Sequence, residues 1–351
     1  MIRPGASNSL TDVPGLLVGS AEDAVARTGV TVVLPDAAAV AAVDVRGGGP
    51  GTRETDALAP ESLVQEIHGL VLGGGSAFGL DAAGALAGWL AARGRGFKLR
   101  DAVVPIVPAA ILFDLANGGD KAWGDAPPYR ALALRAAEAA GREVAQGNRG
   151  AGFGAMAGNL KGGLGTASAV DAATGLAVAA LVAVNSAGSV VMPGTGTFWA
   201  WYLEQEGEMG GQAPPRDPVV LEPELKRGHG GDAAAEPGGN TAIGVIATDA
   251  ALARPALGRL AIMGHDGFAR AIRPAHTPVD GDTLFALATG AGPLPERRDA
   301  LLRLGHMAAD CVARAVCRGI LAAEGLGGMP GYTMLHGSKL GRGAATEGHG
   351  R

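Results

Sequence analysis

Short apolar runs rich in β-branched residues alternate with longer Ala- and Leu-rich segments along almost the whole chain. The short runs are bounded by turn residues and are typical of strands, at residues 30–34, 67–72, 176–184, 242–248 and 283–288. The longer segments have helical spacing with Gly or Pro near their ends, at residues 80–93, 129–140, 255–272 and 298–323. Because both element types are mixed from one end to the other, their order favours a layered α/β core over separate all-α and all-β modules.

The overall composition is that of a globular protein. The 351 residues suffice for one large or two ordinary domains, and 47% of them are hydrophobic against 18% charged. A net charge of −5 gives no basic field for binding phosphate backbones, so we expect no nucleic-acid partner. The 59 glycines follow no fixed period and are expected at turns and close backbone approaches.

The sequence shows no targeting or membrane signal. Residues 1–15 lack a basic stretch leading into an apolar one, so a cytoplasmic location is expected. The apolar stretches are interrupted well before the roughly 20 residues that span a bilayer, so no membrane association is expected. Cys311 and Cys317 lie in an Ala-rich helical segment, which favours buried, unreactive thiols over a disulfide or a metal site.

One long segment, residues 205–240, shows neither helical nor strand periodicity and is rich in Gly, Pro, Glu and Ala. It is interpreted as a long exposed linker, and it ends abruptly at the strand-like run Thr241-Ala-Ile-Gly-Val-Ile-Ala-Thr248. A self-processing hydrolase needs a nucleophile at the start of a strand, because cleavage frees its α-amine and the strand fixes its position. A surface loop that simply leads into a strand has the same pattern, so the Asn-Thr junction alone leaves both interpretations open.

Further motifs occur in a fixed order over nearly the whole chain. The first half contains Thr11-Asp-Val-Pro-Gly15, Thr28-Gly-Val-Thr-Val-Val-Leu-Pro35, Asp44-Val-Arg-Gly47, Pro50-Gly-Thr-Arg-Glu-Thr55 and Gly74-Gly-Ser-Ala-Phe-Gly-Leu-Asp81. The second half contains Lys161-Gly-Gly-Leu-Gly-Thr-Ala-Ser168, Val184-Asn185, Asn240-Thr241, Ile246-Ala-Thr-Asp249 and His276-Thr-Pro-Val-Asp-Gly-Asp282. Together they resemble the DmpA-type aminopeptidases, which include D-stereospecific and β-peptide aminopeptidases and a branch that hydrolyses nylon-type amide oligomers.

This resemblance implies a four-layer αββα sandwich of the N-terminal-nucleophile-hydrolase type, a fold also found in ornithine acetyltransferases. It further implies one catalytic domain, residues 1–351, that cuts itself between Asn240 and Thr241. The products would be an α chain, residues 1–240, and a β chain, residues 241–351, which stay together and assemble into homo-oligomers. The expected substrate is a small peptide or amide, and no cofactor is expected.

The expected chemistry centres on Thr241. A threonine hydroxyl needs a base, and an N-terminal α-amine with a reference pKa of about 7.7 to 8.0 can supply one from the same residue. By resemblance, the side-chain amide of Asn185 is the oxyanion donor, although the end of a strand is also a common place for a turn Asn.

Three charged residues complete the expected site. By resemblance, Lys161 is a cation beside the nucleophile, whereas a Lys in a glycine-rich turn is more often a solvated charge. Asp280 and Asp282 flank one glycine, so they can point the same way and orient Thr241 or bind a substrate amine. A plain Asp-Gly-Asp turn is the alternative.

The chain departs from the aminopeptidase members at several positions. Those members tend to have a serine nucleophile, with serine and glutamate at the positions of Asp280 and Asp282. Here Thr241, Asp280 and Asp282 are more similar to the amide-oligomer-hydrolase branch. A tyrosine that can precede the family lysine is missing from residues 154–160.

Other candidate residues fit no complete motif. Ser76 lies in a sequence that fails the nucleophile-elbow pattern, because Phe78 stands where Gly is required. His265, His276 and His306 lack the spacing of paired metal ligands and are expected to be helix or turn residues, so no metal site is expected. Two alternatives remain open: an acyltransferase of the ornithine acetyltransferase kind, and a non-catalytic scaffold with the same fold.

Overall fold

Two β-sheets face each other in the computed structural model, which describes residues 1–215, 222, 239–293 and 299–340. Within these residues the larger sheet has seven strands, in the order β1 (Ile2–Arg3), β13 (Gly163–Asp171), β14 (Ala177–Asn185), β15 (Thr241–Thr248), β16 (Thr283–Ala288), β4 (Ala39–Val45) and β6 (Glu66–Ile67). The smaller described sheet has five, in the order β2 (Leu16–Asp23), β3 (Thr28–Pro35), β7 (Leu70–Gly73), β10 (Ala109–Ile111) and β5 (Thr52–Arg53). Neighbouring strands are antiparallel except for the parallel pairs β15–β16 and β7–β10.

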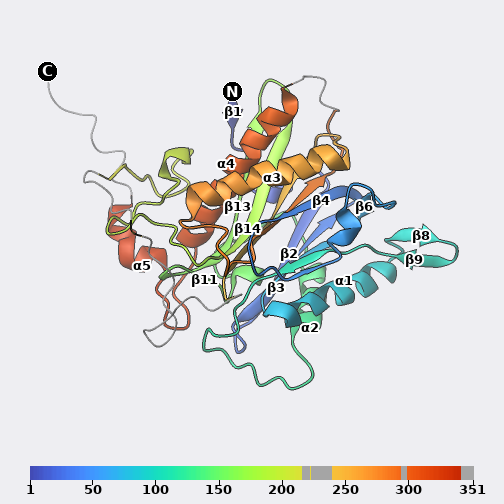
Figure 1. Ribbon diagram of the computed structural model, residues 1–351, viewed down its shortest axis with the longest axis horizontal. Coiled ribbons are helices and arrows are strands. Elements are labelled where there is room, and N and C mark those ends of the chain that lie inside the picture. Colours follow the sequence, from blue (N-terminus) through green and yellow to red (C-terminus); the bar gives the residue numbers. More distant parts are fainter. Residues whose placement is uncertain (216–221, 223–238, 294–298, 341–351) are drawn as a thin grey trace.

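Two pairs of helices cover the outer faces of the sheets (Figure 1). One pair packs on the smaller sheet and consists of α1 (Asp81–Ala91) and α2 (Tyr129–Glu138). The other pair packs on the larger sheet and consists of α3 (Arg254–Ala271) and α4 (Ala300–Leu321). The layers therefore follow the order αββα, which confirms the expected four-layer sandwich.

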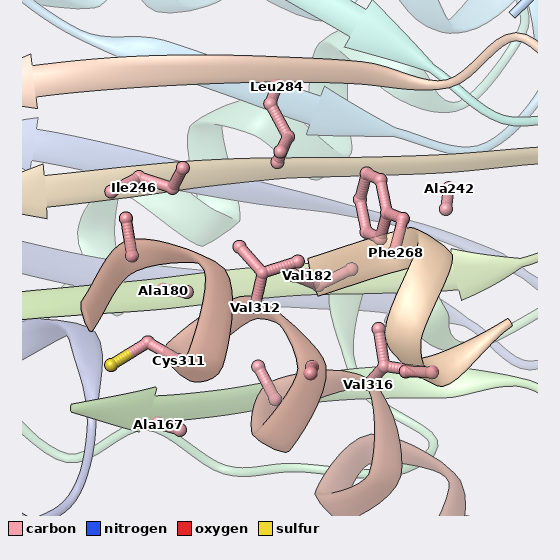
Figure 2. Close-up of a cluster of buried hydrophobic side chains, with 14 of the residues drawn as sticks. Ala167, Ala180, Val182, Ala242, Ile246, Phe268, Leu284, Cys311, Val312 and Val316 are labelled. Carbon is pink, nitrogen blue, oxygen red and sulfur yellow. The ribbon is translucent and has the colours of Figure 1, made fainter. Parts of the chain in front are cut away.

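The alternation of side chains along β14 shows how the layers are held together. Val178, Ala180, Val182 and Val184 face α3 and α4, whereas the alternate residues, from Ala177 to Ala183, face the smaller sheet. Strand β15 behaves in the same way, and Figure 2 shows its Ala242 and Ile246 packed with Phe268 of α3 and Val312 of α4. Because both strands are buried on both faces, they appear in the sequence as continuous apolar runs.

The smaller sheet has a separate apolar core on its outer side. Val30, Val32 and Leu34 of β3 pack there with Leu86 of α1, whereas Val33 of the same strand faces the larger sheet. Three apolar layers thus separate the four layers of secondary structure, and each follows from the two-residue period of the strands.

Four predicted strands are confirmed, as β3, β14, β15 and β16. Residues 67–72, predicted as one strand, belong to two: β6 ends at Ile67 in the larger sheet, and β7 begins at Leu70 in the smaller one. Strands β2, β4 and β13 were not predicted; in β2 and β13, Gly, Ser, Thr or Asp residues interrupt the apolar run. In β13 the small residues let α4 approach closely. A Cβ atom at Gly165 would lie 2.0 Å from the carbonyl oxygen of Ala315. This close contact confirms one of the roles expected for the glycines.

The four predicted helices are confirmed, with ends that differ by a few residues; residue 298, where the last one was expected to begin, lies outside the described residues. Residues 216–221 and 223–238 of the predicted linker also lie outside them. Residues 205–215 contain neither a helix nor a strand, as expected.

The remaining described elements are short. They are the hairpins β8 (Phe97–Leu99) with β9 (Ala102–Val104) and β11 (Met156–Ala157) with β12 (Leu160–Lys161), helix α5 (Tyr332–His336), and 3-10 turns at Leu10–Asp12, Asp56–Leu58, Ser76–Leu80, Gly150–Gly152, Trp201–Leu203 and Gly337–Lys339. In the part of the chain that the structure describes, no helix has the length and apolar character needed to span a membrane.

Candidate active site

Thr241 is the first residue of β15, the central strand of the larger sheet, and only 2% of it is exposed. Its hydroxyl Oγ1 donates a hydrogen bond to the carbonyl oxygen of the preceding residue, Asn240. The backbone N–H of Gly281 donates to the same oxygen at 2.9 Å. The Asn240 carbonyl therefore lies beside the hydroxyl and already accepts two hydrogen bonds.

Gly281 was not predicted as a site residue, and the sheet register explains its position. Asn240 forms a parallel bridge with Asp280, which brings the residue after each of them side by side. A Cβ atom at Gly281 would lie 2.7 Å from Thr241 Oγ1 and 2.7 Å from the carbonyl oxygen of Gly49. Only glycine fits here without displacing the hydroxyl, and the only sequence signal is its place between two aspartates.

Asn185 is the last residue of β14 and is the register partner of Thr241 across the sheet. Its side chain is fully buried. Oδ1 accepts a hydrogen bond from the backbone N–H of Met156 at 2.9 Å, and Nδ2 donates to the carbonyl oxygen of Phe113 at 3.0 Å. These two partners fix the orientation of the amide at the end of the sheet that carries Thr241.

Lys161 lies in β12 and is 1% exposed, which excludes the solvated lysine considered from the sequence. Its Nζ donates to two backbone carbonyls, those of Gly152 at 3.0 Å and Gly162 at 2.7 Å. Burial lowers the pKa of Lys161 to about 7, although the charge of Asp114 acts in the opposite direction. The lysine therefore titrates near neutral pH.

Asp114 is a second buried charge that the sequence interpretation missed. It lies just beyond β10 and is 1% exposed, and its Oδ1 accepts the backbone N–H of Gly75 at 2.8 Å. Burial raises its pKa to about 6, against the opposing charges of Lys121 and Lys161. The available signal was an aspartate three residues after the end of a buried strand, adjacent to Phe113, whose carbonyl holds Asn185.

Asp280 and Asp282 lie on either side of Gly281, and both are buried. Oδ1 of Asp280 accepts the backbone N–H of Ala187 at 3.2 Å; burial, and then the charge of Asp282, raise the pKa of Asp280. Oδ1 of Asp282 accepts the backbone N–H of Ala242 at 2.7 Å. The second aspartate therefore binds the residue immediately after Thr241.

The structure brings one predicted turn residue, His276, into this site. Its ring Nδ1 lies 2.7 Å from Oδ2 of Asp282. His276 is therefore a turn residue that also contacts a residue of the site. His265 lies in α3, as expected, and is 4% exposed. His306 is 55% exposed on α4 and lies 3.4 Å from Asp310.

Neither cysteine is accessible to solvent. Cys311 and Cys317 are free and fully buried in α4, and burial raises the pKa of Cys311 to about 12. This confirms that they are packed as small apolar side chains. Among the described residues, no three or more His, Cys, Asp or Glu side chains form a group that could hold a metal ion.

Two solved structures have the same fold. The β-aminopeptidase of a Burkholderia species matches with a TM-score of 0.69 and 24% identity, covering 95% of this chain and 92% of that one. The L-aminopeptidase D-Ala-esterase/amidase of Ochrobactrum anthropi, described as a new variant among the Ntn hydrolase fold, matches with a TM-score of 0.69 and 21% identity over 96% of both chains. The fold is thus that of the N-terminal-nucleophile (Ntn) hydrolases.

Residues 8–334 match peptidase family S58, and the chain belongs to this family. A Mycobacterium tuberculosis protein described as an uncharacterized aminopeptidase is 46% identical over 343 residues, which are 93% of this chain and 97% of that protein. The 6-aminohexanoate-oligomer endohydrolase of a Kocuria species is 30% identical over 295 residues, covering 81% of this chain and 76% of that protein. The chain is a hydrolase of peptide or amide bonds, and the resemblance drawn from the motifs is confirmed.

Proposed function

We propose that this protein is a self-processing amidohydrolase in which Thr241 first cuts the chain and then attacks the substrate. One observation carries the proposal: the Thr241 hydroxyl and the Gly281 N–H converge on the Asn240 carbonyl oxygen. The peptide bond to be cut thus lies next to a nucleophile, and the carbonyl oxygen of Asn240 faces a backbone N–H donor. This is the arrangement that acyl transfer requires.

The processing step is an N-to-O acyl shift followed by hydrolysis. Thr241 Oγ1 attacks the carbonyl carbon of Asn240, and the charge that develops on the oxygen faces the Gly281 N–H. The C–N bond then breaks, the nitrogen takes up a proton, and an ester joins Asn240 to the threonine. The shift has already freed the α-amine of residues 241–351, and water then hydrolyses the ester, which leaves a carboxylate on residues 1–240 and restores the Thr241 hydroxyl.

In turnover the α-amine of Thr241 accepts the hydroxyl proton, as an N-terminal amine with a reference pKa of about 7.7 to 8.0 can at neutral pH. The hydroxyl attacks the substrate carbonyl to form an acyl-enzyme, which water hydrolyses. Asn185, opposite Thr241 in the register, supplies an oxyanion donor. Lys161 provides a positive charge at the same end of the sheet, and this charge can change near neutral pH. Asp280 and Asp282 orient the new ammonium group of Thr241.

The substrates in this proposal are small peptides or short amide oligomers. The likeness to the 6-aminohexanoate-oligomer endohydrolase supports the second kind, and the likeness to the mycobacterial aminopeptidase supports the first. Residues 1–351 act as one catalytic domain in this proposal. The two fragments stay together because β14 and β15, which lie on opposite sides of the cut in the sequence, pair over the whole length of β15.

The deciding experiment is intact-mass analysis of the purified protein, with N-terminal sequencing of the smaller fragment. We expect two masses, with the smaller fragment beginning Thr-Ala-Ile-Gly. A single full-length mass after long incubation at neutral pH would contradict the proposal. Hydrolysis is then measured with alanine p-nitroanilide and with linear 6-aminohexanoate oligomers. Acetyl-ornithine with glutamate as acceptor tests the acyltransferase alternative, which predicts acetyl transfer faster than hydrolysis.

The proposal also includes a cytoplasmic location and a homo-oligomer of processed protomers. Fractionation of the producing cells tests the first. Light scattering coupled to size-exclusion chromatography tests the second, because a monomer mass of the two fragments together would exclude an oligomer.

A further inference from the structure

Two hydrogen bonds, both to the carboxylate of Asp282, link His276 to the residue that follows the proposed nucleophile. Its ring Nδ1 lies 2.7 Å from Oδ2 of Asp282, and Oδ1 of the same carboxylate lies 2.7 Å from the backbone nitrogen of Ala242. Ala242 is the second residue of β15, next to Thr241. The ring, the carboxylate and the start of the strand therefore form one continuous chain of contacts.

The backbone of His276 adopts a conformation that brings two donors to one acceptor. Its φ angle is 56°, in the left-handed region that non-glycine residues seldom adopt. In this conformation both the backbone N–H, at 3.1 Å, and ring Nδ1 reach Oδ2 of Asp282. An uncommon backbone conformation persists only where its surroundings determine it, and here the Asp282 carboxylate does so.

The donors around Asp282 fix the direction of the ring contact. Each carboxylate oxygen accepts one backbone N–H, from Ala242 at Oδ1 and from His276 at Oδ2. The carboxylate of an aspartate can only accept hydrogen bonds. The ring of His276 therefore donates through Nδ1–H, and this contact selects its tautomer.

A second imidazole supports the ring of His276 from the side. His265 of α3 packs edge-on against it with 4.8 Å between ring centroids, and Phe268 lies edge-on at 6.1 Å. The Nε2 atom of His265 lies 3.0 Å from the carbonyl oxygen of Asp44, which anchors it in turn. Burial lowers the pKa of His265 to about 4, so this supporting ring is neutral at pH 7.

We propose that His276 is a positioning residue that acts on Thr241 through Asp282. The inference rests on the proposed function and adds to it a residue that holds the nucleophile in place. By donating to Oδ2, the ring keeps Oδ1 on the Ala242 N–H and so fixes the start of β15. Without the ring the carboxylate can rotate, and both the Thr241 hydroxyl and the later α-amine lose their alignment.

Two substitutions separate the ring donor from the backbone strain. His276→Gly accommodates the positive φ and keeps the backbone N–H but removes the ring. His276→Asn also accommodates that φ and places an amide donor near the position of Nδ1. His306→Asn, on the exposed surface of α4, is the matched control. Circular dichroism and thermal unfolding of all variants establish that each is folded.

The readouts are the rate of self-cleavage after a pulse of cell-free synthesis, and kcat and KM for alanine p-nitroanilide. We expect His276→Gly to lower the cleavage rate and kcat about 10-fold or more with little change in KM, as a charge-assisted hydrogen bond is lost. His276→Asn should recover most of both rates. Parental rates in His276→Gly, an effect on KM alone, or an equal loss in His276→Asn would overturn the inference.

Failure of the proposed function gives a different result, because the parent itself would then remain uncut between residues 240 and 241. A spectroscopic test needs no turnover: ¹⁵N NMR of labelled histidine in the uncut Thr241→Ala protein. We expect the His276 ring to be protonated at Nδ1. A ring protonated only at Nε2 would contradict the donor role, whatever the rates of the variants.

Discussion

Lys161 and Arg314 are both cationic side chains withdrawn from solvent, at 1% and 0% exposed, yet they are held in opposite ways. The ammonium of Lys161 donates to two backbone carbonyls. The guanidinium of Arg314 binds Glu208 through two nitrogens, with Nη2 at 2.9 Å from Oε2, and also reaches Asn8 at 2.9 Å. Burial lowers the pKa of Lys161 to about 7; at Arg314 burial also acts to lower the pKa, but Glu208 raises it overall.

The difference shows how one fold can use one buried cation for catalysis and another to hold segments of the chain together. A buried cation held by carbonyl dipoles keeps a pKa near neutrality and can change charge during a reaction. A buried cation bound by a carboxylate keeps its charge and joins segments of the chain. Arg314 joins Asn8 and Glu208, which precede the proposed cut, to α4, which follows it. The predictions below test whether the two regions are independent.

The largest effect is expected from Thr241→Ala, which removes the hydroxyl that donates to the Asn240 carbonyl. This variant should remain a folded, uncut and inactive chain, whereas Thr241→Ser should still cut and hydrolyse because it keeps the hydroxyl and the future α-amine. Gel mobility, amide turnover and circular dichroism on the same preparations measure this. Cleavage or full activity in a folded alanine variant would assign the chemistry to another residue.

The Arg314 region should respond in stability and not in chemistry. Glu208→Ala leaves a buried guanidinium without its carboxylate, which should lower the free energy of unfolding by about 3 to 5 kcal/mol. Denaturant unfolding of the variant, with the exposed Glu138→Ala as control, measures the loss. The folded fraction should keep the parental kcat. A large fall in kcat at unchanged stability would show that the two regions are coupled.

Asn185→Ala should reduce hydrolysis about 10² to 10³-fold, equivalent to about 2.7 to 4 kcal/mol of transition-state stabilisation, through loss of one oxyanion donor. Steady-state kinetics at saturating substrate, with thermal unfolding alongside, separate this effect from loss of folded protein. Equal turnover in variant and parent would remove Asn185 from the chemistry and leave it as a support for Met156 and Phe113.

The smallest effect at any single pH step is a pH dependence of stability that belongs to Lys161. Its pKa is about 7 when folded and near 10.5 when unfolded, so between these values the unfolded chain binds more protons. Stability should therefore rise with pH over this window, by at most about 1.4 kcal/mol per pH unit. Lys161→Met in the uncut Thr241→Ala background should lack this rise. Parallel stability curves would mean that Lys161 keeps its charge, as Arg314 does.

The parts of the fold that the sequence predicted are those with helical spacing or a continuous apolar run. Strands β14 and β15 are buried on both faces and so form uninterrupted apolar runs. Strand β13 was not predicted because its glycines Gly163 and Gly165 serve the close approach of α4, and this need is visible only when the helix is in place. Strand propensity describes one segment at a time, whereas the use of glycine in β13 depends on both the strand and the helix that packs on it.

The site divides in a similar way. Thr241, Asn185, Asp280 and Asp282 were named from motifs, and the structure places them at one end of the sheet; their catalytic roles remain proposals. Gly281 and His276 were missed as site residues, because their positions follow from the parallel bridge between Asn240 and Asp280 and from a left-handed turn. Spacing along the chain encodes neither.

The position of Thr241 in the middle of the larger sheet has a consequence for how the enzyme becomes active. The contacts that aim its hydroxyl come from β14, from the segment before β16 and from the strand pairing itself, so they exist only after the sheet has assembled. On the proposed mechanism a misfolded chain cannot make its own active terminus. Self-cleavage then acts as a quality control, because only a molecule that has folded correctly becomes able to hydrolyse amides.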